Sequence, residues 1–200
     1  MISVRIEAKG AMRLPYDPSH YLNALAPGRL PGLLKVIEPD AREVSMGAAP
    51  DSSVETHILN IRGAVAGLVL FDALYDVTYP LEPLPHVNVK LTSFANKNLS
   101  VIGQFFVQPV DTQLIPSSAN GRAASAPEKQ FMVLHVEEWS LRRWMILFAL
   151  PLRIYLKWKV KTEVRRMGEF VAREQGGPPG EGVGFRMSTA TITWISKTKA

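Results

Sequence analysis

Cysteine is absent from this chain of 200 residues. Its absence excludes disulfides, thiolate nucleophiles and cysteine-ligated zinc or iron–sulfur centres. The four histidines are scattered, and none forms a closely spaced pair of the H-x-x-x-H kind, so we expect no metal site and no cofactor. A chain without cysteine suits a reducing intracellular compartment.

Long apolar runs are also missing. No stretch approaches the roughly 20 uncharged apolar residues that a membrane-spanning helix needs. The sequence opens on a strand-like pattern rather than on the basic and apolar segments of a secretory signal. Hydrophobic residues nevertheless make up 46% of the chain, against 20% charged residues, which is enough apolar material for the core of one domain.

Acidic residues are scarce in one segment. Residues 142–173 contain nine Lys or Arg and only two Asp or Glu, so this segment carries a net charge of +7. Because the whole chain carries +5, the remainder carries −2. The basic character therefore belongs to one segment and not to the whole surface.

Alternating apolar and polar residues predict a series of strands. In residues 2–9, for example, Ile2, Val4 and Ile6 would share one face. Similar alternation predicts strands at 54–61, 68–79, 86–94, 99–108 and 131–138, with short strands at 33–38 and 43–46. Residues 63–67 read as a tight, glycine-containing connection between two strands. Because no helices are available for crossovers, we expect an antiparallel meander.

Two helical regions frame these strands. Asp17 and Pro18 are typical of a helix start, with Asp17 as the cap. Near the other end, Pro151 marks the first turn of a long helix that would reach about residue 174. An apolar stripe recurs along it at spacings of three or four residues, as in a helix that packs on a sheet. At about 1.5 Å per residue this helix is long enough to cross the whole sheet.

Two further segments have a different composition. Residues 109–130 are rich in Pro, Ser and Ala and read as a mobile loop. Residues 176–180 form a Gly/Pro linker, and a β-prone, Thr-rich stretch follows at 187–195. This stretch could pair with a sheet edge in this chain or with a partner. We therefore expect a domain over 1–175 and a C-terminal extension over 176–200.

The order of these elements resembles the START-like, or SRPBCC, superfamily of helix-grip proteins. The stretch Asp17-Pro18-Ser19-His20-Tyr21-Leu22 before a Leu-Pro-Gly turn is similar to its early helices. Leu150-Pro151-Leu152-Arg153 is similar to the start of its closing helix. The resemblance is greatest to an uncharacterised branch of cyanobacteria and plastids, which would place the protein in the plastid stroma or the cytoplasm. It implies an α+β helix-grip fold, with a curved antiparallel sheet of about six or seven strands around one long C-terminal helix.

The resemblance also implies a cavity between sheet and helix, in which relatives carry lipids, sterols, hormones, quinones or polyketides. A cavity needs apolar walls and a few polar groups that orient the ligand. The alternative is that the inward side chains simply fill the core. The residues that we predict for the cavity are Phe71, Tyr75, Tyr79, Phe105, Leu152, Tyr155 and Leu156.

No catalytic motif is evident. His135 and Glu137 stand two apart on one predicted strand and share a face, as do Glu55 and His57 on another. Each pair could act as an acid–base couple or could be the polar face of a solvated strand. The superfamily has no common catalytic residue to carry over, so we assign no catalytic residue.

The stretch from Trp139 to Trp158 combines an apolar run, residues 144–150, with basic flanks that include Lys159. It could be a buried connection, a contact with a larger protein complex or a contact with an anionic membrane surface. The basic helix lacks any nucleic-acid motif, which argues against nucleic acid. The candidates for a partner or membrane surface are Arg142, Arg143, Trp144, Phe148, Arg153, Lys157 and Trp194.

Three functions follow from these features. The first is non-enzymatic binding of an apolar small molecule or lipid in the cavity. The second is a subunit of a larger complex, membrane-associated and photosynthetic in the plastid branch, whose cavity would be filled or shrunken. The third is an enzyme such as a cyclase, for which polar residues would have to converge in the cavity. The sequence favours the first two, and so a protein that is not an enzyme.

Overall fold

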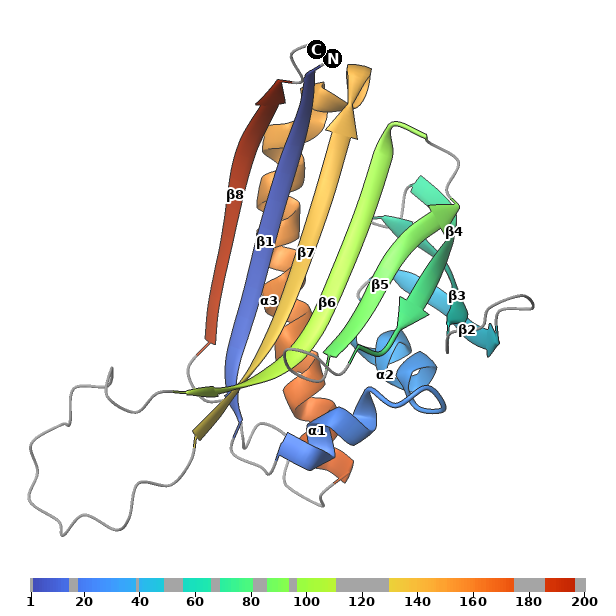
Figure 1. Ribbon diagram of the computed structural model, residues 1–200, viewed down its shortest axis with the longest axis vertical. Coiled ribbons are helices and arrows are strands. Elements are labelled where there is room, and N and C mark those ends of the chain that lie inside the picture. Colours follow the sequence, from blue (N-terminus) through green and yellow to red (C-terminus); the bar gives the residue numbers. More distant parts are fainter. Residues whose placement is uncertain are drawn as a thin grey trace, which may run out of the picture.

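A single curved antiparallel sheet forms the frame of the computed structural model, which describes residues 2–14, 18–38, 40–48, 56–65, 69–80, 86–93, 97–110, 130–174 and 186–196 (Figure 1). Within these residues the sheet has eight strands in the order β2-β3-β4-β5-β6-β7-β1-β8, and all neighbours are antiparallel. The strands are β1 (Ile2–Leu14), β2 (Ala41–Ala48), β3 (His57–Val65), β4 (Val69–Thr78), β5 (His86–Ser93), β6 (Leu99–Val110), β7 (Gln130–Arg142) and β8 (Arg186–Ser196).

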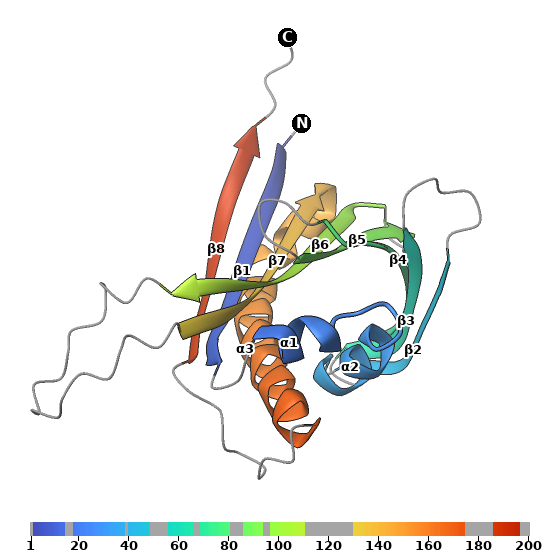
Figure 2. The ribbon, with the colours of Figure 1, turned by 60° about the horizontal axis from the view of Figure 1, so that its bottom comes forward.

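The helices lie on the concave side of this sheet. Two short helices, α1 (Pro18–Ala24) and α2 (Leu30–Ile37), follow β1, and the 3-10 helix η2 (Arg143–Phe148) leads into α3 (Ala149–Glu174). Figure 2 shows α3 along the sheet, with α1 and α2 at the mouth of its curve. The predicted α+β helix-grip fold is therefore confirmed, with eight strands rather than six or seven.

The long helix packs on the sheet through the predicted stripe, and Leu156, Val160, Val164, Met167 and Val171 are all buried. Gly10 of β1 explains how closely α3 approaches the sheet. A Cβ atom at this position would lie 2.8 Å from the carbonyl oxygen of Val160, nearer than real Cβ atoms come. Glycine at this point lets the backbone of α3 rest directly on β1.

Two assignments from the sequence are wrong. Residues 33–38 do not form a strand, because α2 covers most of them and buries Leu30, Leu33, Leu34 and Ile37 at helical spacing. The proline at the start of this helix lies in its first turn, where no amide hydrogen is needed. Gly63 is not part of a tight connection either, because it lies inside β3, paired with β2 and β4.

The Thr-rich stretch joins the sheet of this same chain. Strand β8 pairs with β1 along most of its length, from Ile2 opposite Ser196 to Met12 opposite Arg186. The linker at 176–180 and most of the predicted loop at 109–130 lie outside the described residues, as does Asp17, the predicted helix cap. The division of the chain at residue 175 stays a prediction.

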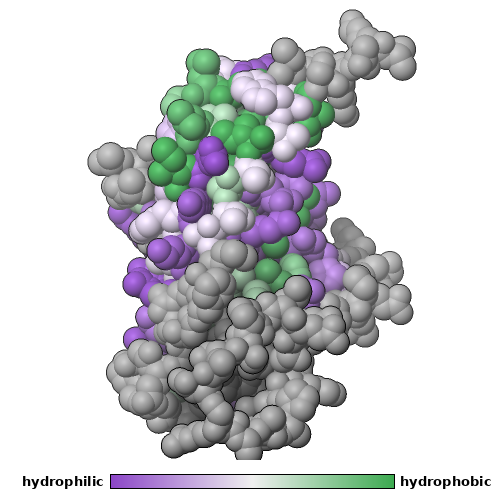
Figure 3. Space-filling model, turned by 90° about the vertical axis from the view of Figure 1, so that its left-hand side faces the viewer, coloured by the Kyte–Doolittle hydropathy of each residue, from purple (hydrophilic) through white to green (hydrophobic). Residues whose placement is uncertain are grey.

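One end of the molecule carries exposed apolar side chains. Figure 3 shows them gathered above a more hydrophilic area on the face beside β8 and α3. They belong to η2, to the first turns of α3 and to β8. All seven residues predicted for a partner or membrane surface are exposed there: Arg142, Arg143, Trp144, Phe148, Arg153, Lys157 and Trp194. Their role as a binding surface stays a prediction.

Candidate functional site

A cavity of about 130 Å³ lies between the sheet and the long helix. Strands β3 to β7 supply most of its walls, while α2 and α3 close the other side. The apolar part of its lining consists of Leu34, Leu59, Ile61, Phe71, Val89, Leu91, Leu99, Val101, Gly103 and Phe105. Such walls suit a mostly apolar ligand.

Four of the seven residues predicted for the cavity line it: Phe71, Tyr75, Phe105 and Tyr155. The other three lie elsewhere. Tyr79 packs at the edge of the main core, and Leu152 and Leu156 belong to a second cluster between α3 and β1. Whether any of them binds a ligand stays a prediction.

One end of the cavity is polar, and Lys159 of α3 is at its centre. The Lys159 Nζ atom lies 2.9 Å from Glu38 Oε2, 2.5 Å from Glu137 Oε1 and 2.6 Å from Glu163 Oε1. The lysine is only 5% exposed. The sequence analysis named it only as a basic flank of residues 144–150, whereas in the structure its ammonium group contacts carboxyl groups from β7, from α3 and from the residue after α2.

His135 of β7 extends this cluster. Its Nδ1 lies 3.2 Å from the carbonyl oxygen of Gln104, which can only accept, so Nδ1 carries a hydrogen. Its Nε2 lies 2.8 Å from Glu163 Oε2 and 3.5 Å from Glu137 Oε1. The contact with Glu163 is an ion pair without the alignment of a hydrogen bond. The ring also stacks on Phe105, with 4.0 Å between centroids.

The two predicted acid–base pairs have different outcomes. His135 and Glu137 are buried, 1% and 6% exposed, and face the cavity rather than solvent. The interpretation of this pair as a solvated face is therefore wrong. Glu55 lies outside the described residues, and His57 makes an edge contact with the ring of Tyr79.

The charged groups in this cluster shift one another's pKa. Burial opposes a charge on His135, but the carboxylates of Glu163 and Glu137 outweigh burial and raise the pKa of His135 to about 9. Burial also acts against Glu163, yet Lys159 and His135 hold the pKa of Glu163 well below its usual range. Both residues are therefore charged at neutral pH.

Glu38 behaves in the opposite way. Burial raises the pKa of Glu38 well above its ordinary value, since the attraction of Lys159 does not compensate, and Glu163 and Glu137 raise it further. Glu38 is thus the carboxyl group of the cluster that keeps its proton most readily. It also lines the cavity, where a ligand can reach it.

Three more side chains complete the polar end. The Tyr155 hydroxyl donates a hydrogen bond to Asp40 Oδ2, and the Trp139 indole donates one to Glu137 Oε2 over 3.1 Å. Tyr75 also lines the cavity. Burial, followed by the charge of Glu38, raises the pKa of Tyr75, so its hydroxyl stays protonated.

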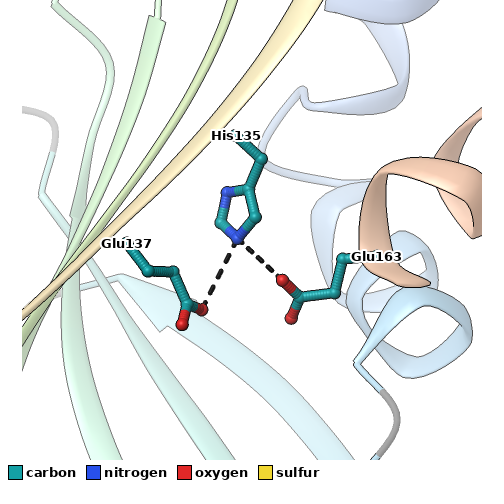
Figure 4. A group of neighbouring side chains, drawn as sticks. All are labelled: His135, Glu137 and Glu163. Atoms are coloured by element: carbon teal, nitrogen blue, oxygen red, sulfur yellow. Dashed lines mark ion pairs between the residues drawn. The ribbon is translucent and has the colours of Figure 1, made fainter. Parts of the chain in front are cut away.

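A histidine and two glutamates close together could in principle hold a metal ion, and Figure 4 shows His135, Glu137 and Glu163 turned toward one another. The sequence argument considered only histidine pairs and so did not foresee this group. However, the ammonium group of Lys159 already lies within 2.6 Å of both carboxylates. A metal ion would have to displace this cation, so the donor set does not fit a resident metal.

Neither a scan of family models nor a search of curated proteins finds a match to this sequence. Solved structures do match. A norcoclaurine synthase point mutant from Thalictrum flavum, in complex with a transition-state analogue, is 10% identical over 86% of this chain and 98% of its own, with a TM-score of 0.59. A protein of Thermus thermophilus is 12% identical over 84% and 98%, with a TM-score of 0.57. Major latex-like protein 151 from Panax ginseng is 8% identical over 80% and 95%, with a TM-score of 0.51.

These similarities define the fold of the protein, which is the helix-grip fold of START-like proteins. At such low identities they show the fold alone, and the match extends over most of each relative. Nothing in them bears on the cyanobacterial and plastid branch, on the compartment or on a larger complex, which stay predictions.

Proposed function

We propose that the protein binds a small, mostly apolar molecule whose polar group points toward Lys159 and its carboxylates. The observation that carries this proposal is the cavity itself, with apolar walls and one charged end. A core that only had to be stable would gain nothing from a cluster of buried charges, since such clusters are often replaceable by apolar residues without loss.

The size of the cavity limits the ligand. A cavity of about 150 Å³ lined by apolar side chains holds benzene. At about 130 Å³ this cavity fits a single ring or a short branched chain without rearrangement. A longer lipid or sterol would need the walls to move apart.

The charge at the polar end limits its chemistry. Four carboxyl groups lie there, from Glu38, Asp40, Glu137 and Glu163, but only two cationic groups, from Lys159 and His135, among the described residues. This excess of acceptors favours a ligand that brings hydrogen-bond donors or a positive charge, such as an amine. A bound cation would also lower the pKa of Glu38 and release its proton.

The direct test is native mass spectrometry of the protein purified gently from its source. A small added mass that is lost on denaturation is the expected result, and its identity can then be read from the released molecule. A chain without added mass could have lost its ligand during purification. It contradicts the proposal only if small probe molecules also fail to bind, which a second measurement tests.

That second measurement is calorimetry with benzylamine, toluene and benzoate, three one-ring probes that differ in charge. We expect benzylamine to bind tightest, with proton release seen as a dependence on the ionisation enthalpy of the buffer. Val101→Phe, which narrows the cavity, should abolish binding, whereas the exposed substitution Lys90→Gln should not. If the three probes gave equally weak heats of binding, and if these were the same for both variants, there would be no binding site in this cavity.

A second candidate function is acid–base catalysis on a molecule in the same cavity. It is favoured by the convergence of His135, Glu137 and Lys159 with a carboxyl group, Glu38, that retains its proton. Glu38→Gln separates the two functions. A binding protein should carry the same molecule with or without this substitution, whereas an enzyme would accumulate a molecule of different mass, its unreacted substrate.

A further inference from the structure

The apolar side chains at one end of the molecule come from three elements. Helix η2 contributes Trp144, Leu147 and Phe148, the start of α3 contributes Leu150, Ile154 and Trp158, and β8 contributes Trp194. Leu147 is 82% exposed and Ile154 is 66% exposed. We call these seven residues the apolar end. Exposed clusters of large apolar side chains mark surfaces that contact something else.

The long helix shows why this surface is not a by-product of folding. Its buried stripe already packs on the sheet. Leu150, Ile154 and Trp158 follow one another at intervals of four and form a second stripe on the solvent side of the same helix. The helix therefore has two apolar faces over its first turns, and only one of them has a partner within the described chain.

Basic residues surround the apolar end. Arg142, Arg143, Arg153, Lys157 and Lys161 are exposed, and residues 142–162 contain no acidic residue at all. The Arg153 side chain also donates a hydrogen bond to the carbonyl oxygen of Ala190, over 2.8 Å, which holds β8 against α3. The surface thus combines protruding apolar groups with a uniform positive charge.

We propose that this end of the molecule docks onto an anionic lipid surface, with the apolar side chains in the boundary between headgroups and acyl chains. Tryptophan is favoured at that depth, and Lys and Arg interact with anionic headgroups. No helix among the described residues is long and apolar enough to cross a membrane. This proposal is independent of what the cavity binds.

A lipid surface explains the observations better than an acidic protein. The apolar end lies where β1 begins and β8 ends (Figures 1 and 3), and each of its seven side chains is at least 47% exposed. Exposed apolar side chains at one end can all enter a fluid lipid bilayer together, even when they project by different distances. A protein partner would need a groove matched to each of them.

The test is sedimentation of the full chain with vesicles of two compositions. We expect binding to vesicles of equal parts phosphatidylglycerol and phosphatidylcholine, at least tenfold weaker binding to pure phosphatidylcholine, and a decrease with added salt. A blue shift of tryptophan fluorescence should accompany binding. The variant Leu147→Ser/Ile154→Ser should lose at least tenfold in affinity.

Charge variants give the matched control. Arg142→Gln/Lys157→Gln/Lys161→Gln should weaken binding at least tenfold, whereas Lys35→Gln/Arg42→Gln/Lys90→Gln removes the same charge elsewhere and should have little effect. If both triple variants lose affinity equally, the attraction is nonspecific and the proposal is wrong.

Two other outcomes would also overturn it. One is that the full chain stays in the supernatant when anionic vesicles are sedimented. The other is that it forms dimers which Leu147→Ser/Ile154→Ser converts to monomers, since the apolar end would then be an interface between copies. Circular dichroism confirms that each variant is folded, and Trp158→Ser provides an independent apolar variant if the double variant is not.

Discussion

His135 and Glu163 face each other inside the molecule, with Nε2 of the imidazole 2.8 Å from Oε2 of the carboxylate, although one residue lies on β7 and the other on α3. Both side chains are about 1% exposed. The contact joins the long helix to β7, an inner strand of the sheet, at the polar end of the cavity. Its strength depends on the imidazole carrying a charge, which makes it sensitive to pH.

The stability of the protein should therefore fall in mildly alkaline solution. The pKa of His135 is raised from an unfolded value of 6.5 to about 9, so its contribution is complete below about pH 6.5 and is lost as pH rises through about 9. A shift of this size corresponds to roughly 3 kcal/mol. Urea unfolding of the wild type and of His135→Phe at several pH values measures it. The difference between the two should shrink as pH rises, and a constant difference would contradict the assignment.

Lys159 should be far more important for stability than its exposed neighbour on the same helix. Lys159→Met leaves the buried carboxylates of Glu137 and Glu163 without this cation and should cost about 3–5 kcal/mol at neutral pH. Lys157→Met, on the solvent side, should change stability by less than about 0.5 kcal/mol. Urea unfolding compares them. Acidification should restore part of the loss in Lys159→Met, since its carboxyl groups can then protonate; similar losses for both variants would mean that the cluster contributes little.

Gly63 should tolerate no side chain, because a Cβ atom there would lie 1.9 Å from the carbonyl oxygen of Asp40. The backbone of Asp40 approaches β3 closely, and it accepts a hydrogen bond from the amide of Ala64 over 3.0 Å. Gly63→Ala should lower stability by about 2 kcal/mol. Gly47→Ala is the control, since nothing lies within 4 Å of its added Cβ. Thermal unfolding of both variants is the measurement, and equal melting temperatures would refute this account of Gly63.

The buried stripe of α3 can be tested with charges. Leu156→Asp and Val160→Asp place an unpaired carboxylate at positions with no exposure, and each should cost several kcal/mol, enough to unfold the domain. Ile154→Asp, two positions before Leu156 but 66% exposed, should remain folded. Circular dichroism and gel filtration distinguish these results. If all three variants were equally folded, the helix would not be anchored as the structure indicates.

Periodicity predicted the long helix and most of the strands, because both depend on burying one face against one large surface. It failed for α2, which has only eight residues. The four apolar residues of 33–38, Leu33, Leu34, Val36 and Ile37, fit a short strand as well as they fit a short helix. Only contact with α3 and β2 decides between these two conformations.

The polar cluster shows another limit of the sequence. Alternation correctly placed His135 and Glu137 on one face, but it could not say that this face is the buried one. The sequence did contain a signal for Lys159 and Glu163. Lys159 lies three residues after Leu156 and Glu163 four residues after Lys159, so both charged residues fall at positions of the apolar stripe. Charged residues at stripe positions are a sign of buried ion pairs. Their meeting with Glu38 and His135 depends on tertiary structure, which no local pattern encodes.

The place of β1 in the sheet has a consequence for biosynthesis. This strand precedes every other described element, yet its two neighbours, β7 and β8, are the last two strands of the described chain. A ribosome therefore releases β1 long before either partner exists, and its backbone groups must wait unpaired. Because contacts between distant segments form slowly, we expect the sheet to close only after β7 and β8 have both left the ribosome, and the unpaired β1 to need protection from aggregation in the meantime.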